Sequence, residues 1–130
     1  MTATRGRSTR AAKILIVEDE SIVALHIAAE MRQHGYTVLA TVATGEAALE
    51  KCDVLHPDLV LMDIRLQGEM NGIQAGRAIQ DRFAIPVLYL TAYADQVESL
   101  LPHGRVKSRY LAKPFKESDL YEIVETLLHT

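Results

Sequence analysis

Short apolar segments alternate with longer segments of helical periodicity from residue 13 onward. The run at 59–62 is too short for a helix, and the other runs are rich in β-branched and aliphatic residues, so they predict strands. A strand that is apolar at every position is buried on both faces, as strands of parallel sheets are. The predicted strands are 13–17, 36–41, 59–63, 86–91 and 110–112.

Segments with a helical spacing of apolar residues follow these strands. The first begins at Ser21 and ends before Gly35, because glycine readily adopts the left-handed conformation that closes a helix. The interval 95–109 is the least regular, because Pro102 and Gly104 would end a helix there early. The predicted helices are 21–34, 44–52, 73–82, 95–101 and 120–128, and residues 67–72 are predicted to form a loop.

Strands that alternate with helices predict an α/β fold. The sheet is then parallel, the crossovers are right-handed, and helices cover both faces, giving three layers. All strands of such a sheet point the same way, so their carboxyl ends meet at one edge. Open α/β sheets bind their ligands at that edge, and candidate site residues are therefore sought where the strands end.

Composition restricts the class of protein. The 130 residues suffice for one domain; 48% are apolar and 24% charged, and the net charge of −3 argues against a general nucleic-acid binder. A single cysteine excludes a disulfide framework within the chain. No secretory signal or long apolar stretch appears, so we expect a cytoplasmic protein without membrane contact. Residues 1–12, with three arginines, are predicted to be a flexible basic tail, and 13–130 the folded domain.

Polar residues stand at the ends of four predicted strands: Glu18 and Asp19 after the first, Asp63 at the third, Thr91 at the fourth and Lys113 after the fifth. Carboxylates gathered at one edge repel one another unless a cation intervenes. Magnesium prefers oxygen ligands and usually takes one or two carboxylates, so the prediction is direct contact by Asp19 and Asp63, with Glu18 acting through water. Calcium and manganese remain alternatives.

A carboxylate beside a bound cation is suited to phosphoryl transfer, where a protein mainly positions groups and neutralises charge. Asp63 is the predicted nucleophile, Lys113 would neutralise a phosphoryl oxygen, and the Thr91 hydroxyl would donate a hydrogen bond to another. Taken singly, each residue has an ordinary structural explanation, such as a helix cap for Thr91. Their combination at strand ends favours an aspartyl phosphate.

With these residues assembled, 13–128 resembles the receiver domain of two-component response regulators. Leu15–Glu20 is similar to the acidic motif of that family, and Leu59–Asp63 is similar to its phosphoacceptor strand. Leu90–Ala92 resembles the segment with its switch threonine, and Tyr110–Phe115 resembles its lysine motif. All four segments occur in the family's order.

The resemblance implies a flavodoxin-like (βα)5 fold with sheet order 2-1-3-4-5. It implies that a histidine kinase or a histidine phosphotransfer protein delivers a phosphoryl group to Asp63, and that Mg²⁺ is the cofactor. The implied metal ligands are Glu18, Asp19, Asp63 and the backbone carbonyl of Arg65.

The resemblance also implies a cis peptide bond between Lys113 and Pro114, and a switch in which Thr91 and Tyr110 move on phosphorylation. The output would pass to a downstream protein target through a stand-alone receiver, a monomer or weak dimer with no direct nucleic-acid contact.

Two segments depart from the family pattern. The loop after Asp63 is one residue longer than usual and lacks the usual proline. The side chains of Arg65 and Tyr93 are predicted to flank the phosphoryl site and slow the attack of water, so we expect a long-lived phosphoryl group. Pro102 shortens the helix after Thr91, which predicts a remodelled output face.

Two other functions use a similar sheet. The first is a magnesium-dependent phosphohydrolase with an aspartyl-phosphate intermediate, although such enzymes usually carry paired aspartates after the first strand. The second is a flavodoxin-type cofactor binder, which needs a phosphate-binding loop where this chain has Glu18–Glu20.

Overall fold

Five parallel strands form one sheet in the computed structural model, which describes residues 11–66, 68–92 and 108–129. Its order is β3-β2-β4-β5-β6, which is 2-1-3-4-5 along the chain, and the predicted flavodoxin-like topology is confirmed. The strands are β2 (Lys13–Val17), β3 (Thr37–Val42), β4 (Leu59–Asp63), β5 (Val87–Thr91) and β6 (Ser108–Ala112).

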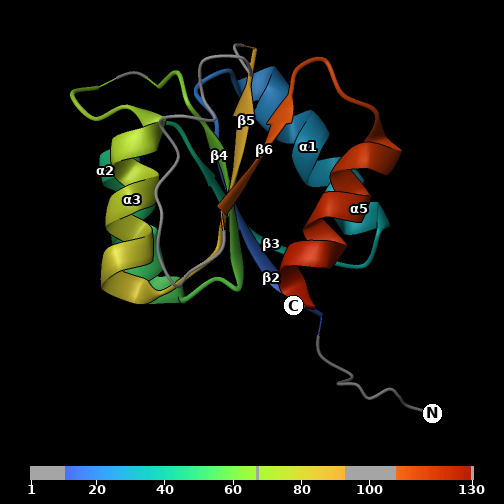
Figure 1. Cartoon of the computed structure of the whole chain (residues 1–130), viewed down its shortest axis with the longest axis horizontal. Coiled ribbons are helices and arrows are strands. Elements are labelled where there is room, and N and C mark those ends of the chain that lie inside the picture. The colour runs from blue at the N-terminus through green and yellow to red at the C-terminus, as the bar shows by residue number, and fades with distance from the viewer. Residues whose placement is uncertain (1–10, 67, 93–107, 130) are drawn as a thin grey trace.

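Helices cover both faces of the sheet and complete the predicted three layers (Figure 1). One face carries α1 (Ser21–Gln33) and α5 (Glu117–Leu128), and the other carries α2 (Gly45–Leu55) and α3 (Gly72–Phe83). Each face has its own apolar core, because alternate side chains of a strand point to opposite faces. In β4, Leu59 and Leu61 enter the core under α1 and α5, while Val60 and Met62 enter the core under α2 and α3.

The structure shifts several predicted boundaries. β3 runs one residue beyond 36–41, α2 runs three residues beyond Cys52, and β6 begins two residues before Tyr110. α5 begins three residues before its first buried apolar residue, Leu120. Gly35 has a φ of 90° and closes α1 as predicted. The predicted helix at 95–101 and most of the predicted basic tail lie outside the described residues.

No helix in the described part of the chain has the length and apolar character needed to cross a membrane.

Candidate functional site

A cavity of about 400 Å³ lies at the carboxyl ends of the strands. Its walls come from the segments that follow β2, β4, β5 and β6, where the parallel sheet brings distant parts of the chain together. The lining residues are Asp19, Glu20, Asp63, Arg65, Thr91, Ala92 and Lys113. Five of the predicted site residues therefore share one cavity: Asp19, Asp63, Arg65, Thr91 and Lys113.

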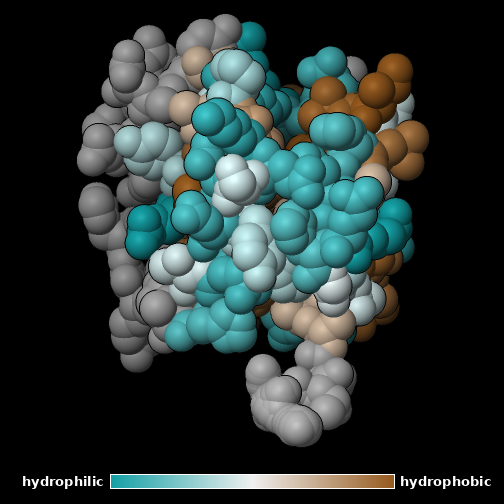
Figure 2. Space-filling view, turned by 90° about the vertical axis from the view of Figure 1, so that its right-hand side faces the viewer, coloured by the Kyte–Doolittle hydropathy of each residue, from teal (hydrophilic) through white to brown (hydrophobic). Residues whose placement is uncertain are grey.

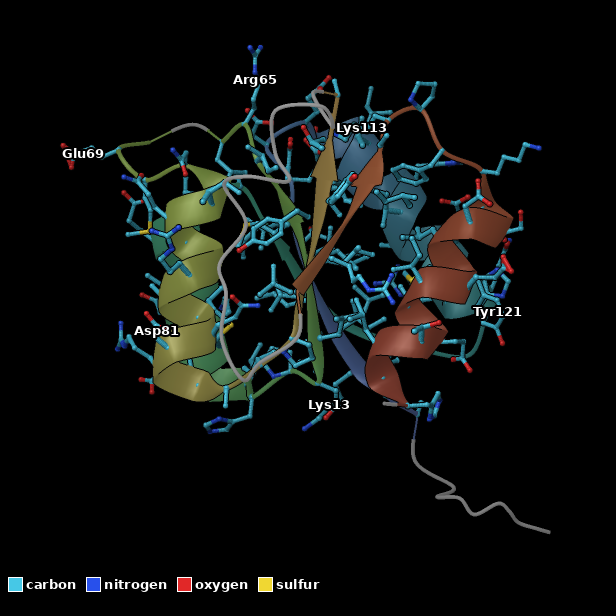
Figure 3. The ribbon with its side chains drawn as sticks, viewed as in Figure 1. Lys13, Arg65, Glu69, Asp81, Lys113 and Tyr121 are labelled. Carbon is cyan, nitrogen blue, oxygen red and sulfur yellow. The ribbon has the colours of Figure 1, made fainter. Side chains whose placement is uncertain are left out.

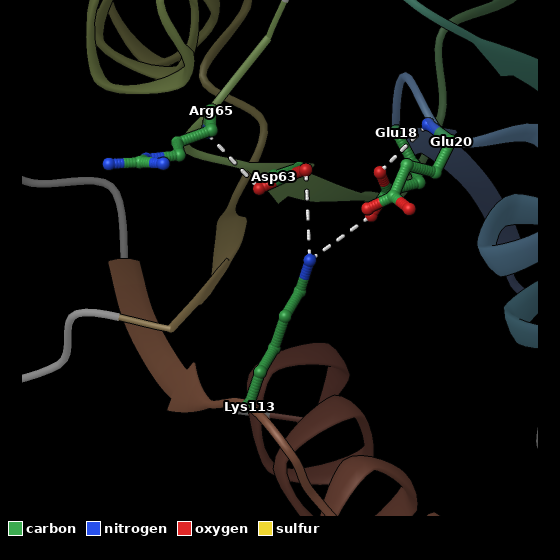
Figure 4. A network of polar contacts seen from close by, with 5 residues as sticks. All are labelled: Glu18, Glu20, Asp63, Arg65 and Lys113. Atoms are coloured by element: carbon green, nitrogen blue, oxygen red, sulfur yellow. Dashed lines mark hydrogen bonds and ion pairs between the residues drawn. The ribbon is translucent and has the colours of Figure 1, made fainter.

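The Lys113 ammonium lies near two carboxylates of the site (Figure 4). Its Nζ lies 3.2 Å from Oε1 of Glu18 and 3.7 Å from Oδ2 of Asp63. The Lys113 backbone N–H donates a 2.7 Å hydrogen bond to the Thr91 carbonyl, which ties the end of β6 to the end of β5. The expected cis peptide bond between Lys113 and Pro114 is present. A single ammonium thus lies within 4 Å of two carboxylates that stand at the ends of different strands.

Asp63 is buried at the end of β4, with 6% of its surface exposed. The pKa of its carboxyl is raised to about 6, because burial and the nearby Glu18 carboxylate together outweigh the opposing effect of Lys113. The Arg65 backbone N–H donates a 3.1 Å hydrogen bond to Oδ1 of Asp63. Near neutral pH the carboxylate form therefore predominates, although the site holds it less favourably than water would.

Glu18 is also buried, but its hydrogen-bond and ion-pair partners lower its pKa and favour its charged form. Burial raises the pKa of Glu18, whereas a 3.0 Å hydrogen bond from the Glu20 N–H and the nearby Lys113 ammonium outweigh burial and lower it. Glu18 contacts Lys113 but is not among the residues that line the cavity. Its contacts suit it to holding Lys113 in place.

Glu20 lines the cavity, although the sequence reasoning left it out of the candidate ligands. The carboxylates of Glu18, Asp19 and Glu20 each offer an oxygen within 4.8 Å of the others. The signal in the sequence is that Glu20 is the third consecutive acidic residue after β2. With Asp19 and Asp63, Glu20 gives the cavity three carboxylates, a donor set that suits a hard divalent cation.

The loop after β4 is held by its own hydrogen bonds. The Gly72 N–H donates to the Ile64 carbonyl over 2.9 Å, and a side chain on Gly72 would collide with the Asp63 carbonyl. Asn71 and Gln74 cap the start of α3 reciprocally, with two hydrogen bonds of 2.9 Å. The loop thus begins and ends close to the backbone of Asp63.

The remaining predicted residues differ in their relation to the cavity. Thr91 is buried at the end of β5 and lines the cavity. Arg65 lines it too, but its side chain points away from Asp63 and Lys113 (Figures 3 and 4). Tyr110 pairs with Tyr89 across β5 and β6 and packs against the core under α2 and α3. Tyr93 lies outside the described residues.

Sequence comparison decides the family. The response regulator receiver domain matches residues 14–125, nearly the whole chain. The chain belongs to this family. Receiver domains are phosphoacceptor signalling modules of two-component systems, so the two alternatives, a phosphohydrolase and a flavodoxin-type cofactor binder, are set aside.

Several receiver-containing proteins are similar to this chain. The transcriptional regulatory protein PdtaR of Mycobacterium tuberculosis is 34% identical over 115 residues, which are 87% of this chain and 55% of PdtaR. The DNA-binding response regulator MtrA of the same organism is 34% identical over 116 residues, which are 89% of this chain and 50% of MtrA. The chain thus spans about half the length of these relatives.

A solved structure of a receiver domain supports the same assignment. The receiver domain of the sensor histidine kinase PA1611 from Pseudomonas aeruginosa PAO1 is 32% identical, with a TM-score of 0.80. The match covers 93% of this chain and 100% of that one, and that domain has a magnesium ion coordinated in its active-site cleft.

Proposed function

We propose that the protein is a phosphoacceptor receiver in which Asp63 takes a phosphoryl group from a phosphohistidine of a histidine kinase or a histidine phosphotransfer protein. The observation that carries this proposal is the placement of Asp63 in a cavity with Lys113 Nζ 3.7 Å from its carboxylate. The ammonium can neutralise the oxygens of an incoming phosphoryl group.

The transfer exchanges one bond to phosphorus for another. An Asp63 oxygen attacks phosphorus, the N–P bond of the phosphohistidine breaks, and the imidazole leaves with the electron pair of that bond. Asp63 must be ionised to attack, which its pKa of about 6 allows near neutral pH. Lys113 and the Thr91 hydroxyl would then bind phosphoryl oxygens, and hydrolysis of the acyl phosphate would restore the carboxylate.

The donor set fits magnesium. Asp19 and Asp63 would supply carboxylate oxygens, the Arg65 backbone carbonyl a neutral oxygen, and Glu20 a further carboxylate at the cavity wall. Glu18 is buried and does not line the cavity, so it would act on the ion through water. When bound, the ion neutralises charge on the phosphoryl oxygens.

An apolar groove beside the cavity supports a protein as the phosphoryl donor. The groove has a volume of about 420 Å³, and Val23, Ile27 and Phe115 provide apolar walls while Lys113 joins it to the cavity. Next to it on α1, the large aliphatic side chains of Ile22 and Leu25 are 82% and 65% exposed and extend the apolar surface. A helix of the donor packed here would bring its phosphohistidine close to Asp63.

The experiment is phosphorylation by acetyl phosphate with magnesium, followed by intact-mass measurement. We expect the wild type to gain the mass of one phosphoryl group, and Asp63→Asn to gain none. Asp81→Asn is the matched control, because Asp81 is an exposed carboxylate on α3 whose side chain points to solvent (Figure 3). Equal labelling of Asp63→Asn and the wild type would refute Asp63 as the acceptor.

Two finer parts of the proposal have separate tests. Thr91 and Tyr110 are proposed to change position on phosphorylation and to alter the surface that a downstream protein binds. NMR shifts at these residues that differ between free and phosphorylated protein would support this.

The side chains of Arg65 and Tyr93 are proposed to slow the attack of water on the phosphoryl group. The test is the rate at which the phosphoryl group is lost in Arg65→Ala and Tyr93→Ala. A rate equal to that of the wild type would contradict the proposal.

A further inference from the structure

Histidine, glutamate and tyrosine side chains line the contact between α1 and α5, on the face of the sheet away from α2 and α3 (Figure 1). Beneath them, Ile27, Met31, Leu120 and Val124 join one apolar core. Figure 2 shows this side of the molecule with a mainly hydrophilic surface. We call these polar residues the α1–α5 seam: His26, Glu30, His34, Tyr36, Glu117, Tyr121, Glu125 and His129.

His34, the residue that follows α1, makes two contacts with α5. Its Nε2 lies 2.9 Å from Oε2 of Glu117, and its ring stacks on Tyr121 with centroids 4.2 Å apart and planes at 20°. The side chain is 28% exposed, so the contact is partly shielded from water. An imidazole held in this way forms a much stronger bond to a carboxylate when it is protonated.

Glu30 brings a second carboxylate from α1 to the same place. Its side chain is 12% exposed and lies 3.6 Å from Nε2 of His26. Burial raises the pKa of Glu30, and the Glu117 carboxyl raises it further, while His26 and His34 act against the increase. With neutral histidines, Glu30 and Glu117 would therefore repel each other across the helix contact.

The end of the seam around Tyr36 and Glu125 is joined by a hydrogen bond that does not require a charged histidine. The Tyr36 hydroxyl donates a hydrogen bond to Oε2 of Glu125, and Tyr36 is itself buried beside Tyr121. Glu125 also lies 3.4 Å from Nε2 of the largely exposed His129. The response to pH should thus concentrate at the His34–Glu117 end, at the start of α5.

We propose that the α1–α5 seam is a proton-operated latch, in which protonation of His34 fastens the first turns of α5 to the end of α1. The groups that face His34 and Glu30 are His26 on α1, and Glu117 and Tyr121 on α5. Lys113 lines the groove that Glu30 also lines, and Arg32 and Lys116 are exposed neighbours in sequence. Acidification both charges the imidazoles and relieves the repulsion between the carboxyls, so the two effects have the same sign.

The latch gives the receiver a second input besides the phosphoryl group. Only Pro114, Phe115 and Lys116 separate Lys113 from Glu117, the first residue of α5. A change in how firmly α5 is held therefore acts on the segment that presents Lys113 to Asp63 and to the groove. Protons and phosphoryl groups would then bias the same element, and such coupling is reciprocal.

The test is hydrogen exchange of the full chain at about pH 6 and about pH 8, corrected for the intrinsic exchange rate. It is carried out in an Asp63→Asn background without phosphodonor, which removes a second group that titrates near pH 6. We expect the protection of amides in the first half of α5, relative to α3, to rise roughly fivefold on acidification. The rise should disappear in His34→Gln, which keeps hydrogen-bonding capacity without a titratable charge.

His56→Asn is the matched control. His56 ends α2 on the opposite face of the sheet, and asparagine tolerates its left-handed backbone, so the rise should persist. Glu117→Gln should abolish it, as His34→Gln does. Equal protection of α5 at the two pH values, or a full rise in His34→Gln, would overturn the latch. Because acceptor chemistry is not measured, either result leaves the proposed phosphorylation of Asp63 untouched.

Discussion

At the scale of single residues, Asp63 and Glu18 show that burial alone does not set a charge state. Both carboxyls are nearly inaccessible to water, and both form an ion pair with Lys113. Glu18 has the shorter ion pair and a backbone N–H at 3.0 Å, so its charged form is favoured and its pKa is lowered. For Asp63, burial and the charge of Glu18 raise the pKa to about 6, because its ion pair with Lys113 is longer and compensates less. The site thus keeps its reactive carboxylate incompletely neutralised.

The raised pKa of Asp63 predicts that Asp63→Asn stabilises the protein. The folded-state pKa of about 6 lies above the ordinary 3.8, so the folded chain holds this proton more tightly than the unfolded chain. Ionised Asp63 therefore lowers the free energy of unfolding, fully above the folded-state pKa and not at all below the ordinary one. Without metal, urea denaturation should show Asp63→Asn more stable by about 2–3 kcal/mol at pH 8, and the gain should vanish near pH 4.

The control for this experiment is Asp81→Asn, which should change stability little at either pH. An unchanged free energy of unfolding for Asp63→Asn at pH 8 would show that Lys113 already compensates the buried charge completely.

Glu20 carries a prediction about metal affinity. Divalent-ion sites bind more tightly as more charged ligands surround the ion, so Glu20→Gln should weaken magnesium binding by roughly three- to tenfold in titration calorimetry. Glu69→Gln is the matched control, because Glu69 is exposed and points away from the cavity (Figure 3). Equal affinities for Glu20→Gln and the control would exclude Glu20 from the site.

At the scale of elements, the sequence predicts the strand and helix boundaries that the hydrophobic pattern sets. It does not predict the boundaries that depend on backbone pairing. β2 and β4 end where predicted, because a buried apolar run stops at a charged residue. β6 begins earlier than predicted because Ser108 and Arg109 have no apolar pattern, yet they pair with Val87 and Leu88. Likewise, the first turn of α5 contains acidic residues that suit a helix N-terminus without facing a core. The position of Glu20 at the cavity depends on how the chain turns into α1, which residue spacing does not specify.

The packing of α3 on β5 predicts that a glycine-to-alanine substitution in this helix destabilises the protein. Glycine to alanine in a helix usually stabilises by up to about 1 kcal/mol. A Cβ on Gly76, however, would meet the Tyr89 ring, with Cε1 and Cζ only 2.7 Å away. Gly76→Ala should therefore lower the free energy of unfolding by about 1–3 kcal/mol in urea denaturation.

The companion variants identify the cause. In a Tyr89→Leu background, which removes the ring, Gly76→Ala should be neutral or stabilising. Within the described part of the chain the buried Tyr89 hydroxyl has no hydrogen-bond partner, so Tyr89→Phe should not destabilise. A loss of stability on Gly76→Ala that persists with Leu at position 89 would point to α3 itself instead of the ring contact.

At the scale of the whole molecule, the two faces of the sheet carry different features. The face with α1 and α5 carries the apolar groove and the seam, while the other face packs Tyr89 and Tyr110 into one core with α2 and α3. The cavity lies at the edge where the two cores meet, and each of its walls belongs to a different strand. A ligand that bridges these walls therefore stabilises the assembled sheet, and no single element could bind it alone.

This arrangement predicts that magnesium raises the stability of the whole domain in a pH-dependent way. A ligand that binds only the folded state stabilises it by about 2.7 kcal/mol at 100 times its Kd, so the Tm should rise with magnesium and fall back with EDTA. Protons compete with the ion for Asp63, whose pKa is about 6, so the rise should be full at pH 8 and much smaller at pH 5. Sodium chloride at equal ionic strength should give no comparable rise. A similar magnesium effect in Asp63→Asn would mean that the ion binds elsewhere, because that variant lacks the carboxylate of the central strand.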